Sequence, residues 1–258
     1  MEKADMPENN NQVRLAKFMA SAGVGSRRRC EEMILEGRIT VNGQPVLTPA
    51  MNVDSRRDVV KFEGRVLEAP VEYVYVMLNK PAGYTCSAKD EHAQQLVYEL
   101  LPEHLGRLFT IGRLDRETEG LLLLTNDGEM AQKLTHPSFQ VEKKYIAECE
   151  GIFTDRAKYA MLDGIMDDGE LLRAKRVTNL RAHEDTFMLE VVLTEGKKRE
   201  VRRLCACVGI PVLRLARVEF AGLQLGNLPT GAWRPLDDFE LRLLKGAKFA
   251  SAKNEGKL

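Results

Sequence analysis

Four consecutive leucines, Leu121 to Leu124, place the tightest constraint on what this 258-residue chain can fold into. The run follows a polar loop and ends at Asn126-Asp127-Gly128, a sequence typical of a turn. A short apolar run between such signals is typical of a strand buried inside a core. We therefore expect a core strand here, with the polar loop held against its beginning.

The loop before this strand brings charged side chains together, among them Arg113, Asp115 and Arg116. Positive potential from flanking arginines can keep an aspartate ionised, and a rigidly held carboxylate can serve as a nucleophile or a base. The residue types alone favour a simpler interpretation, an Asp–Arg ion pair in a surface loop. The loop thus makes Asp115 a candidate and leaves both interpretations open.

The hydrophobic pattern predicts an α+β protein with two folded domains. We expect a disordered tail at 1–11, a small domain of helices and a hairpin at 12–70, a larger domain at 71–245 and a polar C-terminal tail at 246–258. Helices are expected at 14–23 and 27–36, the second capped by Ser26. A hairpin should follow, with its turn at Asn42-Gly43.

In the larger domain, strands and helices alternate at irregular spacings. A regular strand–helix repeat is absent, so we expect a mixed, mainly antiparallel sheet. The expected strands are 73–78, 120–125, 144–149, 187–194 and 212–220, and the expected helices are 129–135, 155–162 and 200–207.

The formal net charge is zero, so the distribution of the basic residues is more informative than their number. Between Gly196 and Arg217 seven basic residues accompany a single acid, Glu200. Such a stripe suits a phosphate backbone, although a solvated helix face would show the same pattern. The basic residues are Lys197, Lys198, Arg199, Arg202, Arg203, Arg214 and Arg217.

Several kinds of protein are disfavoured by what the sequence lacks. It has no apolar run of membrane-spanning length, and residues 1–11 have no apolar segment of a secretory signal. The five cysteines are too scattered for a disulfide framework or a four-ligand zinc site. There is no Gly-rich phosphate loop and no metal-ligand cluster, and His92, His104, His136 and His183 are isolated from one another. We expect a cytoplasmic protein with reduced thiols.

Four segments, in order, resemble the motifs of the bacterial ribosomal-RNA pseudouridine synthases of the RsuA/RluB type. The most specific is Gly112-Arg113-Leu114-Asp115 with the leucine-rich strand after it, and the catalytic aspartate of the family falls on Asp115. Residues 78–84 resemble the first motif. Glu142-Lys143-Lys144-Tyr145 resembles the second, whose tyrosine falls on Tyr145, and residues 195–203 resemble the third, whose basic residue falls on Arg202. The resemblance spans residues 73–240.

The N-terminal domain is similar to the small RNA-binding module, sometimes called the α-L motif, that often precedes this catalytic domain. The matching pieces are 14–17, 25–28 and 37–43. The residues that we expect to contact RNA are Arg14, Lys17, Ser26, Arg27, Arg28, Arg38, Lys197, Lys198, Arg199 and Arg203.

The resemblance implies isomerisation of a uridine to pseudouridine, with no cofactor and no metal. The target base would leave its stack, and Asp115 would attack the ribose or abstract a ribose proton. Tyr145 would stack under the uracil, Arg202 would pair with Asp115 or with a phosphate, and Arg113 would support the site.

Residues 198–203 and 231–236 are more similar to the large-subunit enzymes than to the small-subunit enzyme, so 23S ribosomal RNA is the expected substrate. We expect the protein to be a monomer. One alternative is an enzyme for 16S ribosomal RNA. Another is a non-enzymatic RNA-binding assembly factor, which would not need Asp115. A third, an RNA glycosidase, would need a second carboxylate, for which Glu117 and Glu119 are candidates by spacing.

Overall fold

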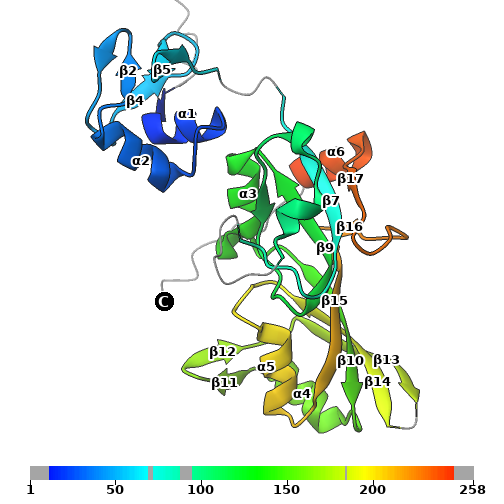
Figure 1. The fold of residues 1–258 in the computed structure, drawn as a ribbon. Helices are drawn as coiled ribbons and strands as arrows, with labels where there is room; N and C mark the ends of the chain where they lie inside the picture. The colour runs from blue at the N-terminus through cyan, green and yellow to red at the C-terminus, as the bar shows by residue number, and fades with distance from the viewer. Residues whose placement is uncertain (1–11, 69–71, 88–94, 184, 247–258) are drawn as a thin grey trace, which may run out of the picture. The chain divides into compact units, whose positions relative to one another are not determined.

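The computed structural model describes residues 12–68, 72–87, 95–183 and 185–246 (Figure 1). They belong to two compact units, 1–73 and 74–258, and each unit is described by itself. The tail predicted at 1–11 lies outside the described residues, as do Pro70, His92 and all of the predicted C-terminal tail except Gly246. No helix in these ranges is long and apolar enough to cross a membrane.

The first unit packs two helices, α1 (Leu15–Ser21) and α2 (Arg27–Leu35), against short strands. Both helices are as predicted, and Ser26 caps α2 because its hydroxyl oxygen accepts a hydrogen bond from the Arg29 N–H at 3.2 Å. The predicted hairpin is also confirmed: Asn42 and Gly43 have φ of 52° and 81°, as a tight primed turn requires. The strands are β1 (Gln12–Arg14) with β4 (Asn52–Asp54), and β2 (Ile39–Val41), β3 (Gln44–Pro45), β5 (Val60–Phe62) and β6 (Arg65–Val66) in a second sheet.

A nine-stranded sheet forms the second unit, in the order β13-β14-β10-β15-β9-β7-β17, with β16 beside β15 and β8 beside β9. Among its described pairs only β9 and β15 run parallel, so the prediction of an α+β domain with a mixed, mainly antiparallel sheet is confirmed. The strands are β7 (Tyr75–Lys80), β8 (Phe109–Ile111), β9 (Thr118–Thr125), β10 (Lys143–Glu150), β13 (Arg176–His183), β14 (Thr186–Leu193), β15 (Val212–Phe220), β16 (Leu223–Gln224) and β17 (Trp233–Pro235).

Helices cover both faces of this sheet (Figure 1). Side chains of α3 (Gly128–Thr135) and α6 (Asp238–Gly246) pack in one apolar cluster, and those of α4 (Asp155–Asp163) and α5 (Glu200–Cys207) pack in the other. The hairpin of β11 (Ile165–Asp167) and β12 (Glu170–Leu172) lies outside the large sheet, and three short 3₁₀ helices span Val97–Leu100, Glu103–Leu105 and Pro137–Phe139.

The leucine run lies in the interior of this arrangement. Leu121 and Leu123 belong to one apolar cluster and Leu122 and Leu124 to the other, because successive side chains of a strand point to opposite faces. The segment is therefore a core strand buried on both faces, as its sequence predicted.

Several elements of the second unit were not predicted: the short strands β8, β11, β12, β16 and β17, the longer strand β13 and the helix α6. β13 is an edge strand with mostly exposed side chains, so it lacks the apolar alternation of a half-buried strand. α6 does have a start signal in its sequence: the Asp237 carboxylate accepts from the Glu240 N–H at 2.8 Å, and the Glu240 carboxylate accepts from the Asp237 N–H at 3.0 Å. This reciprocal pair is a capping box.

Candidate active site

A cleft of about 630 Å³ opens in the second unit beside β9, β10 and β15. The loop before β9 contributes Asp115, and β10 contributes Tyr145. Segments far apart in the sequence thus meet at one cavity. It also takes in Lys143, Glu200, Arg217 and Phe220.

Asp115 is half-buried at this cleft, and its backbone carbonyl accepts a hydrogen bond from the Thr118 N–H at 3.0 Å. Within the described ranges, no hydrogen bond or ion pair engages its carboxylate. Arg113 is exposed at the same cleft and makes no ion pair with it there. The Asp–Arg ion pair favoured by residue types alone is therefore not formed among these residues, and the carboxylate faces the cleft without a partner.

Lys80 holds the loop that carries Asp115. Its side chain is fully buried, and Nζ donates to the carbonyl oxygens of Pro81, Arg116 and Thr118 at 2.9, 3.1 and 2.8 Å. Burial lowers the pKa of this lysine below its ordinary value. The sequence motifs predict no separate role for Lys80, although a lysine at the end of the apolar run of β7 is a signal that points to one.

A backbone contact adds to this bracing. The Gly83 N–H donates to the Arg116 carbonyl at 2.8 Å, and the Arg116 Nε donates to the Gly83 carbonyl at 3.3 Å. The segment that resembles the first motif therefore supports the segment that carries Asp115.

Tyr145 lies on β10, 9% exposed, and lines the cleft as its predicted role requires. In the antiparallel register it stands opposite Arg217 of β15. Tyr145 therefore belongs to the apolar cluster on one face of the sheet and also lines the cleft.

Arg202 does not pair with Asp115. Its Nη1 donates to the Val212 carbonyl at 3.0 Å, and its Nη2 donates to the Glu117 carbonyl at 3.3 Å. Both Nη atoms of Arg202 thus donate to backbone carbonyls. The predicted pairing of Arg202 with Asp115 is therefore wrong for the described structure. Arg202 instead ties α5 to the loop of Asp115, and its contact with a phosphate stays a prediction.

Arg217 is a buried arginine that lines the cleft. It is 1% exposed, its Nε donates to the Leu121 carbonyl at 2.8 Å, and its guanidinium carbon lies 4.8 Å from the centre of the Phe220 ring. In the sequence Arg217 is only one charge of a basic stripe. Position within the stripe could not distinguish it, because its burial depends on the neighbours of β15.

Two further titratable groups at the cleft have shifted pKa values. Burial and the nearby Glu195 carboxylate raise the pKa of Glu200 to about 7. Burial and the charge of Arg217 lower the pKa of Lys143 to about 8. Lys197 forms an ion pair with Glu195 at 2.5 Å, so the predicted RNA contact Lys197 has a partner within the protein.

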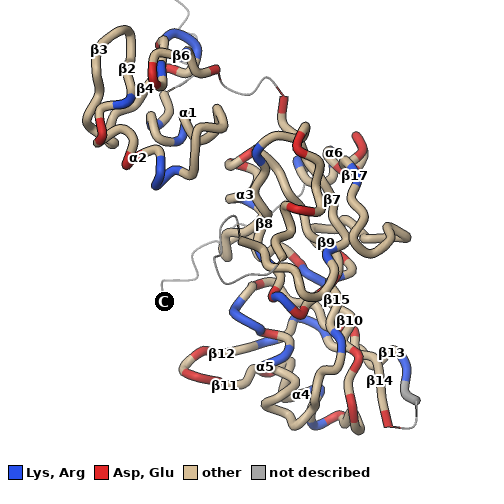
Figure 2. The backbone as a smooth tube through the Cα atoms, in the orientation of Figure 1, with Lys and Arg blue, Asp and Glu red and all other residues tan. Residues whose placement is uncertain are grey.

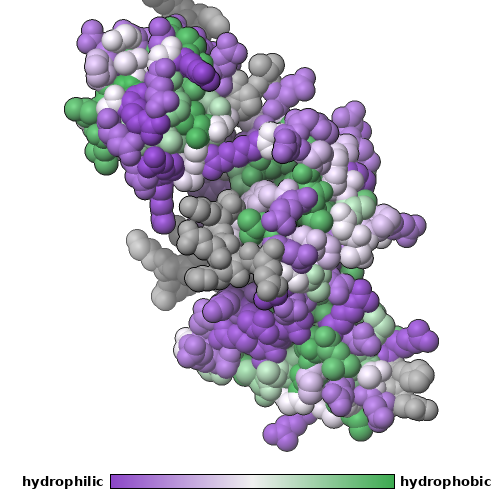
Figure 3. Space-filling model, in the orientation of Figure 1, coloured by the Kyte–Doolittle hydropathy of each residue, from purple (hydrophilic) through white to green (hydrophobic). Residues whose placement is uncertain are grey.

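Hydrophilic residues gather over α5 and the segment that leads into it (Figures 2 and 3). Lys198 and Arg199 are exposed there, without an ion pair in the described part of the chain. Arg203 differs, because it pairs with Asp167 and Glu170 and so anchors the β11–β12 hairpin. Arg203 therefore makes a structural contact, and its contact with RNA stays a prediction.

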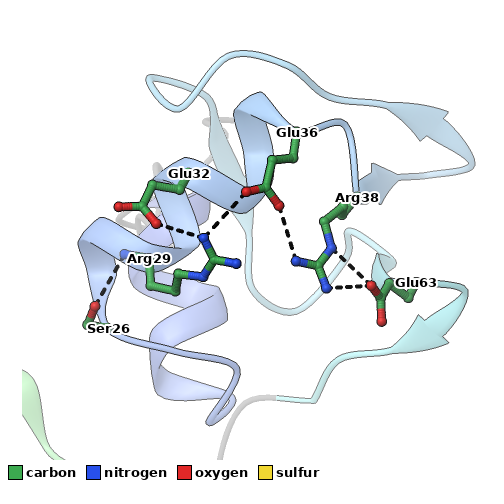
Figure 4. Close-up of polar contacts among 6 residues, drawn as sticks. All are labelled: Ser26, Arg29, Glu32, Glu36, Arg38 and Glu63. Atoms are coloured by element: carbon green, nitrogen blue, oxygen red, sulfur yellow. Dashed lines mark hydrogen bonds and ion pairs between the residues drawn. The ribbon is translucent and has the colours of Figure 1, made fainter. Parts of the chain in front are cut away.

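In the first unit, Arg38 and Arg29 belong to a charge network (Figure 4). Arg38 pairs with Glu63 and Glu36, and Arg29 pairs with Glu32 and Glu36. The predicted RNA contact Arg38 is thus already paired with carboxylates.

Other predicted RNA contacts of this unit are placed differently. Arg27 and Arg28 are exposed and form no ion pair with the described residues. Arg14 donates to the Ala50 carbonyl at 2.9 Å, Lys17 is half-buried, and the Ser26 hydroxyl is used as the helix cap. Arg27 and Arg28 are therefore the strongest phosphate candidates.

No group of three or more His, Cys, Asp or Glu side chains in the described ranges is arranged to hold a metal ion. Expectations about cofactors and metals stay predictions.

Two family models match the chain. Residues 74–207 match the RNA pseudouridylate synthase family, and residues 13–60 match the S4 domain. The two matched segments fall in the second and the first compact unit, respectively.

Relatives match over most of the chain. It is 38% identical over 234 residues to the ribosomal large subunit pseudouridine synthase B of Bacillus subtilis, covering 90% of this chain and 95% of that protein. It is 36% identical to an uncharacterized RNA pseudouridine synthase of Aquifex aeolicus, covering 94% and 98%. A crystal structure of a pseudouridylate synthase superposes with a TM-score of 0.64 at 29% identity, covering 90% of this chain and 99% of that one.

Proposed function

Because the chain belongs to the RNA pseudouridylate synthase family and carries an S4 domain ahead of the synthase unit, we propose that it isomerises one uridine of large-subunit ribosomal RNA, with Asp115 as the residue that acts on the ribose. That the protein is a pseudouridine synthase follows from the family. The position of the uridine, the role of Asp115 and the extrusion of the base are the proposal.

The observation that carries the role of Asp115 is its unpartnered carboxylate at the cleft, on a loop braced by Lys80. Pseudouridine formation breaks the bond between uracil N1 and ribose C1′ and forms a bond between C5 and C1′. C5 loses a proton and N1 gains one, so no group enters or leaves. A rigid carboxylate next to the ribose can begin this exchange by attack on the sugar or by abstraction of a ribose proton.

The target uridine must leave its stack before its ribose can reach a half-buried carboxylate. Tyr145 in the cleft wall offers an aromatic face for the extruded base, and such stacking does not depend on the identity of neighbouring bases. The surrounding RNA would then be read through shape, loops and phosphates.

The large-subunit assignment is supported by relatives in Bacillus subtilis and Vibrio cholerae, both named ribosomal large subunit pseudouridine synthase B, at 38% and 36% identity. We extend the proposal to a monomer that acts in the cytoplasm without a cofactor or metal. The competing assignments are a 16S ribosomal RNA target and an RNA-binding factor without activity.

The direct test compares wild type with Asp115→Asn on ribosomal RNA from cells that lack the gene. Pseudouridine is mapped by chemical labelling and primer-extension stops. Wild type should restore one stop in 23S RNA, and Asp115→Asn, which keeps the side-chain volume, should restore none. Glu117→Gln is the matched control, because the Glu117 carboxylate is exposed and should be dispensable.

Each outcome has a separate meaning. A stop restored by Asp115→Asn would refute the role of the carboxylate, and a stop in 16S RNA would refute the substrate. Loss of the stop in Glu117→Gln would contradict the expectation that Glu117 is dispensable. A wild type that released uracil and restored no stop would favour the two-carboxylate glycosidase alternative.

A further inference from the structure

Unsatisfied polar atoms are concentrated at the cleft. Four buried side-chain nitrogen or oxygen atoms lack a hydrogen-bond partner among the described residues: Thr118 Oγ1, Glu200 Oε1, Arg202 Nε and Arg217 Nη2. Three of the four residues, all except Arg202, line the one cleft that Asp115 lines. Buried polar groups in folded proteins are generally satisfied, so the clustering indicates that a ligand completes these bonds.

Of these three residues, Arg217 has the greatest need of a hydrogen-bond partner, because it is a buried charged group. Its side chain is 1% exposed, and Nε is held by the Leu121 carbonyl, which fixes the plane of the guanidinium. No carboxylate forms an ion pair with it in the described part of the chain, and Phe220 supports one face. Since burial of an unpaired cation is costly, Nη2 is a donor that lacks the acceptor it needs.

The neighbours of Arg217 show which acceptor can reach it. Tyr145 stands opposite Arg217 on β10, and residues directly opposite in an antiparallel pair have Cβ atoms about 5 Å apart. On the other side the register partner is Gly120 of β9, whose lack of a side chain lets the β9 backbone lie directly against the Arg217 backbone, so no side chain of β9 stands between Arg217 and the cleft at this position. A flat ring stacked on Tyr145 would therefore present its edge to the guanidinium of Arg217.

We propose that Arg217 binds a carbonyl oxygen of the extruded uracil, O2 or O4, through Nη2. This inference rests on the proposed function and adds a catalytic residue to it. When the C1′–N1 bond breaks, its electron pair passes to N1 and spreads onto O2 and O4. A fixed cation at one of these oxygens stabilises that charge, keeps the detached uracil in the cleft and is present before the reaction begins.

The test replaces the oxygen that Arg217 is proposed to bind. RNA fragments are prepared with uridine, 2-thiouridine or 4-thiouridine at the position mapped with wild type. Single-turnover rates are then measured for wild type, Arg217→Met and Arg217→Lys. Sulfur is a weaker hydrogen-bond acceptor than oxygen. Because hydrogen bonds to charged groups are strong, one of the two thio substitutions should lower the single-turnover rate of wild type about tenfold or more.

Arg217→Met, which keeps the length of the side chain, should be slow on uridine and should show no further loss with the same thio substitution. RNA affinity should change little, because the contact is strongest when the uracil carries charge. Arg217→Lys should keep part of the rate and part of the sensitivity to sulfur.

Three results would overturn the proposal. One is a wild-type rate indifferent to both thio substitutions, which is decisive even if Arg217→Met fails to fold. Another is an equal thio effect in wild type and in Arg217→Met. The third is a shift in the pH midpoint of the single-turnover rate in Arg217→Met, with the thio effect unchanged. That result would mean that Arg217 acts on the Asp115 carboxylate and not on the uracil. Wild type inactive on unmodified RNA would instead refute the proposed function.

Discussion

Lys80 is buried and braces the loop that carries Asp115, whereas Asp115 itself lines the cleft. Two of the carbonyl oxygens that Lys80 binds, those of Arg116 and Thr118, belong to the residues that follow Asp115, and the third belongs to Pro81 beside Lys80 itself. A lysine is suited to this, because its ammonium group has three donors and no acceptor.

Lys80→Met should therefore loosen the loop without filling the cleft. We expect a loss of stability of about 2–4 kcal/mol, since three buried carbonyls lose a charged donor, and a loss of activity larger than at any exposed lysine. Trp233 is the only tryptophan and lies on β17 next to β7, so its fluorescence reports unfolding of the synthase unit. Lys133→Met on the exposed side of α3 is the control, and equal stability of the two variants would contradict the role of Lys80.

Glu200 gives the synthase unit a pH dependence of known sign. Its pKa is raised from 4.5 to about 7, mainly by burial, so the folded protein binds the proton more tightly than the unfolded chain. The contribution of Glu200 to the free energy of unfolding is fully present below pH 4.5 and is lost as the pH rises to about 7. The total loss is up to about 3 kcal/mol.

Glu200→Gln should remove this slope between pH 5 and 7. The measurement is denaturant unfolding at several pH values, followed by the fluorescence of Trp233. Exposed Glu103→Gln should keep the slope of wild type. The prediction fails if Glu200→Gln and wild type lose stability in parallel over this range. Lys143, whose pKa is lowered to about 8, affects the pH dependence of stability only above pH 7.

At the scale of the elements, the parallel pairing of β9 with β15 assembles the cleft, because it brings the start of β9 beside Arg217. Gly120 permits this contact. Its φ is +99°, and a Cβ atom there would lie 2.2 Å from the Arg217 carbonyl oxygen. Both the backbone conformation and the space exclude a side chain.

Gly120→Ala should accordingly destabilise the synthase unit by about 3 kcal/mol or more, through overpacking and strain together. Gly226→Ala is a matched control: its φ is also positive, at +60°, but a Cβ atom there would meet nothing within 4 Å. It should lose only about 1 kcal/mol. Equal midpoints in guanidinium chloride for the two variants would contradict the close approach.

At the scale of the whole molecule, the S4 domain is expected to bind RNA separately from the chemistry. The double variant Arg27→Gln/Arg28→Gln should weaken RNA binding and reduce the slope of log K against log salt by about 1 to 2, because each lost phosphate contact removes about 0.7–0.9 from it. Single-turnover rates at saturating enzyme should not change.

Arg29→Gln is the control for this prediction, since Arg29 already pairs with Glu32 and Glu36 and should contribute less to the slope. Removal of residues 1–70 should reproduce the effect of the double variant in larger measure. A salt slope unchanged in both would contradict a docking role for the domain.

Much of the fold follows from local signals. The two helices of the first domain, the Ser26 cap and the Asn42-Gly43 turn depend on neighbours a few residues away, and each is found as predicted. The core strand at Leu121 to Leu124 is found as well. The edge strand β13 was missed because exposure leaves no apolar pattern.

The sequence by itself determined the family, the helices and the core strand with strong local signals, and the choice of Asp115 as the candidate carboxylate. Only the tertiary structure decided that Arg202 binds backbone carbonyls while Arg217 lies at the cleft, and that Lys80 braces the loop. The reason is physical: a side chain's partners depend on which strands become neighbours. The pairing of Arg217 with Gly120 and Tyr145 joins segments that are distant in the chain and have no common local pattern.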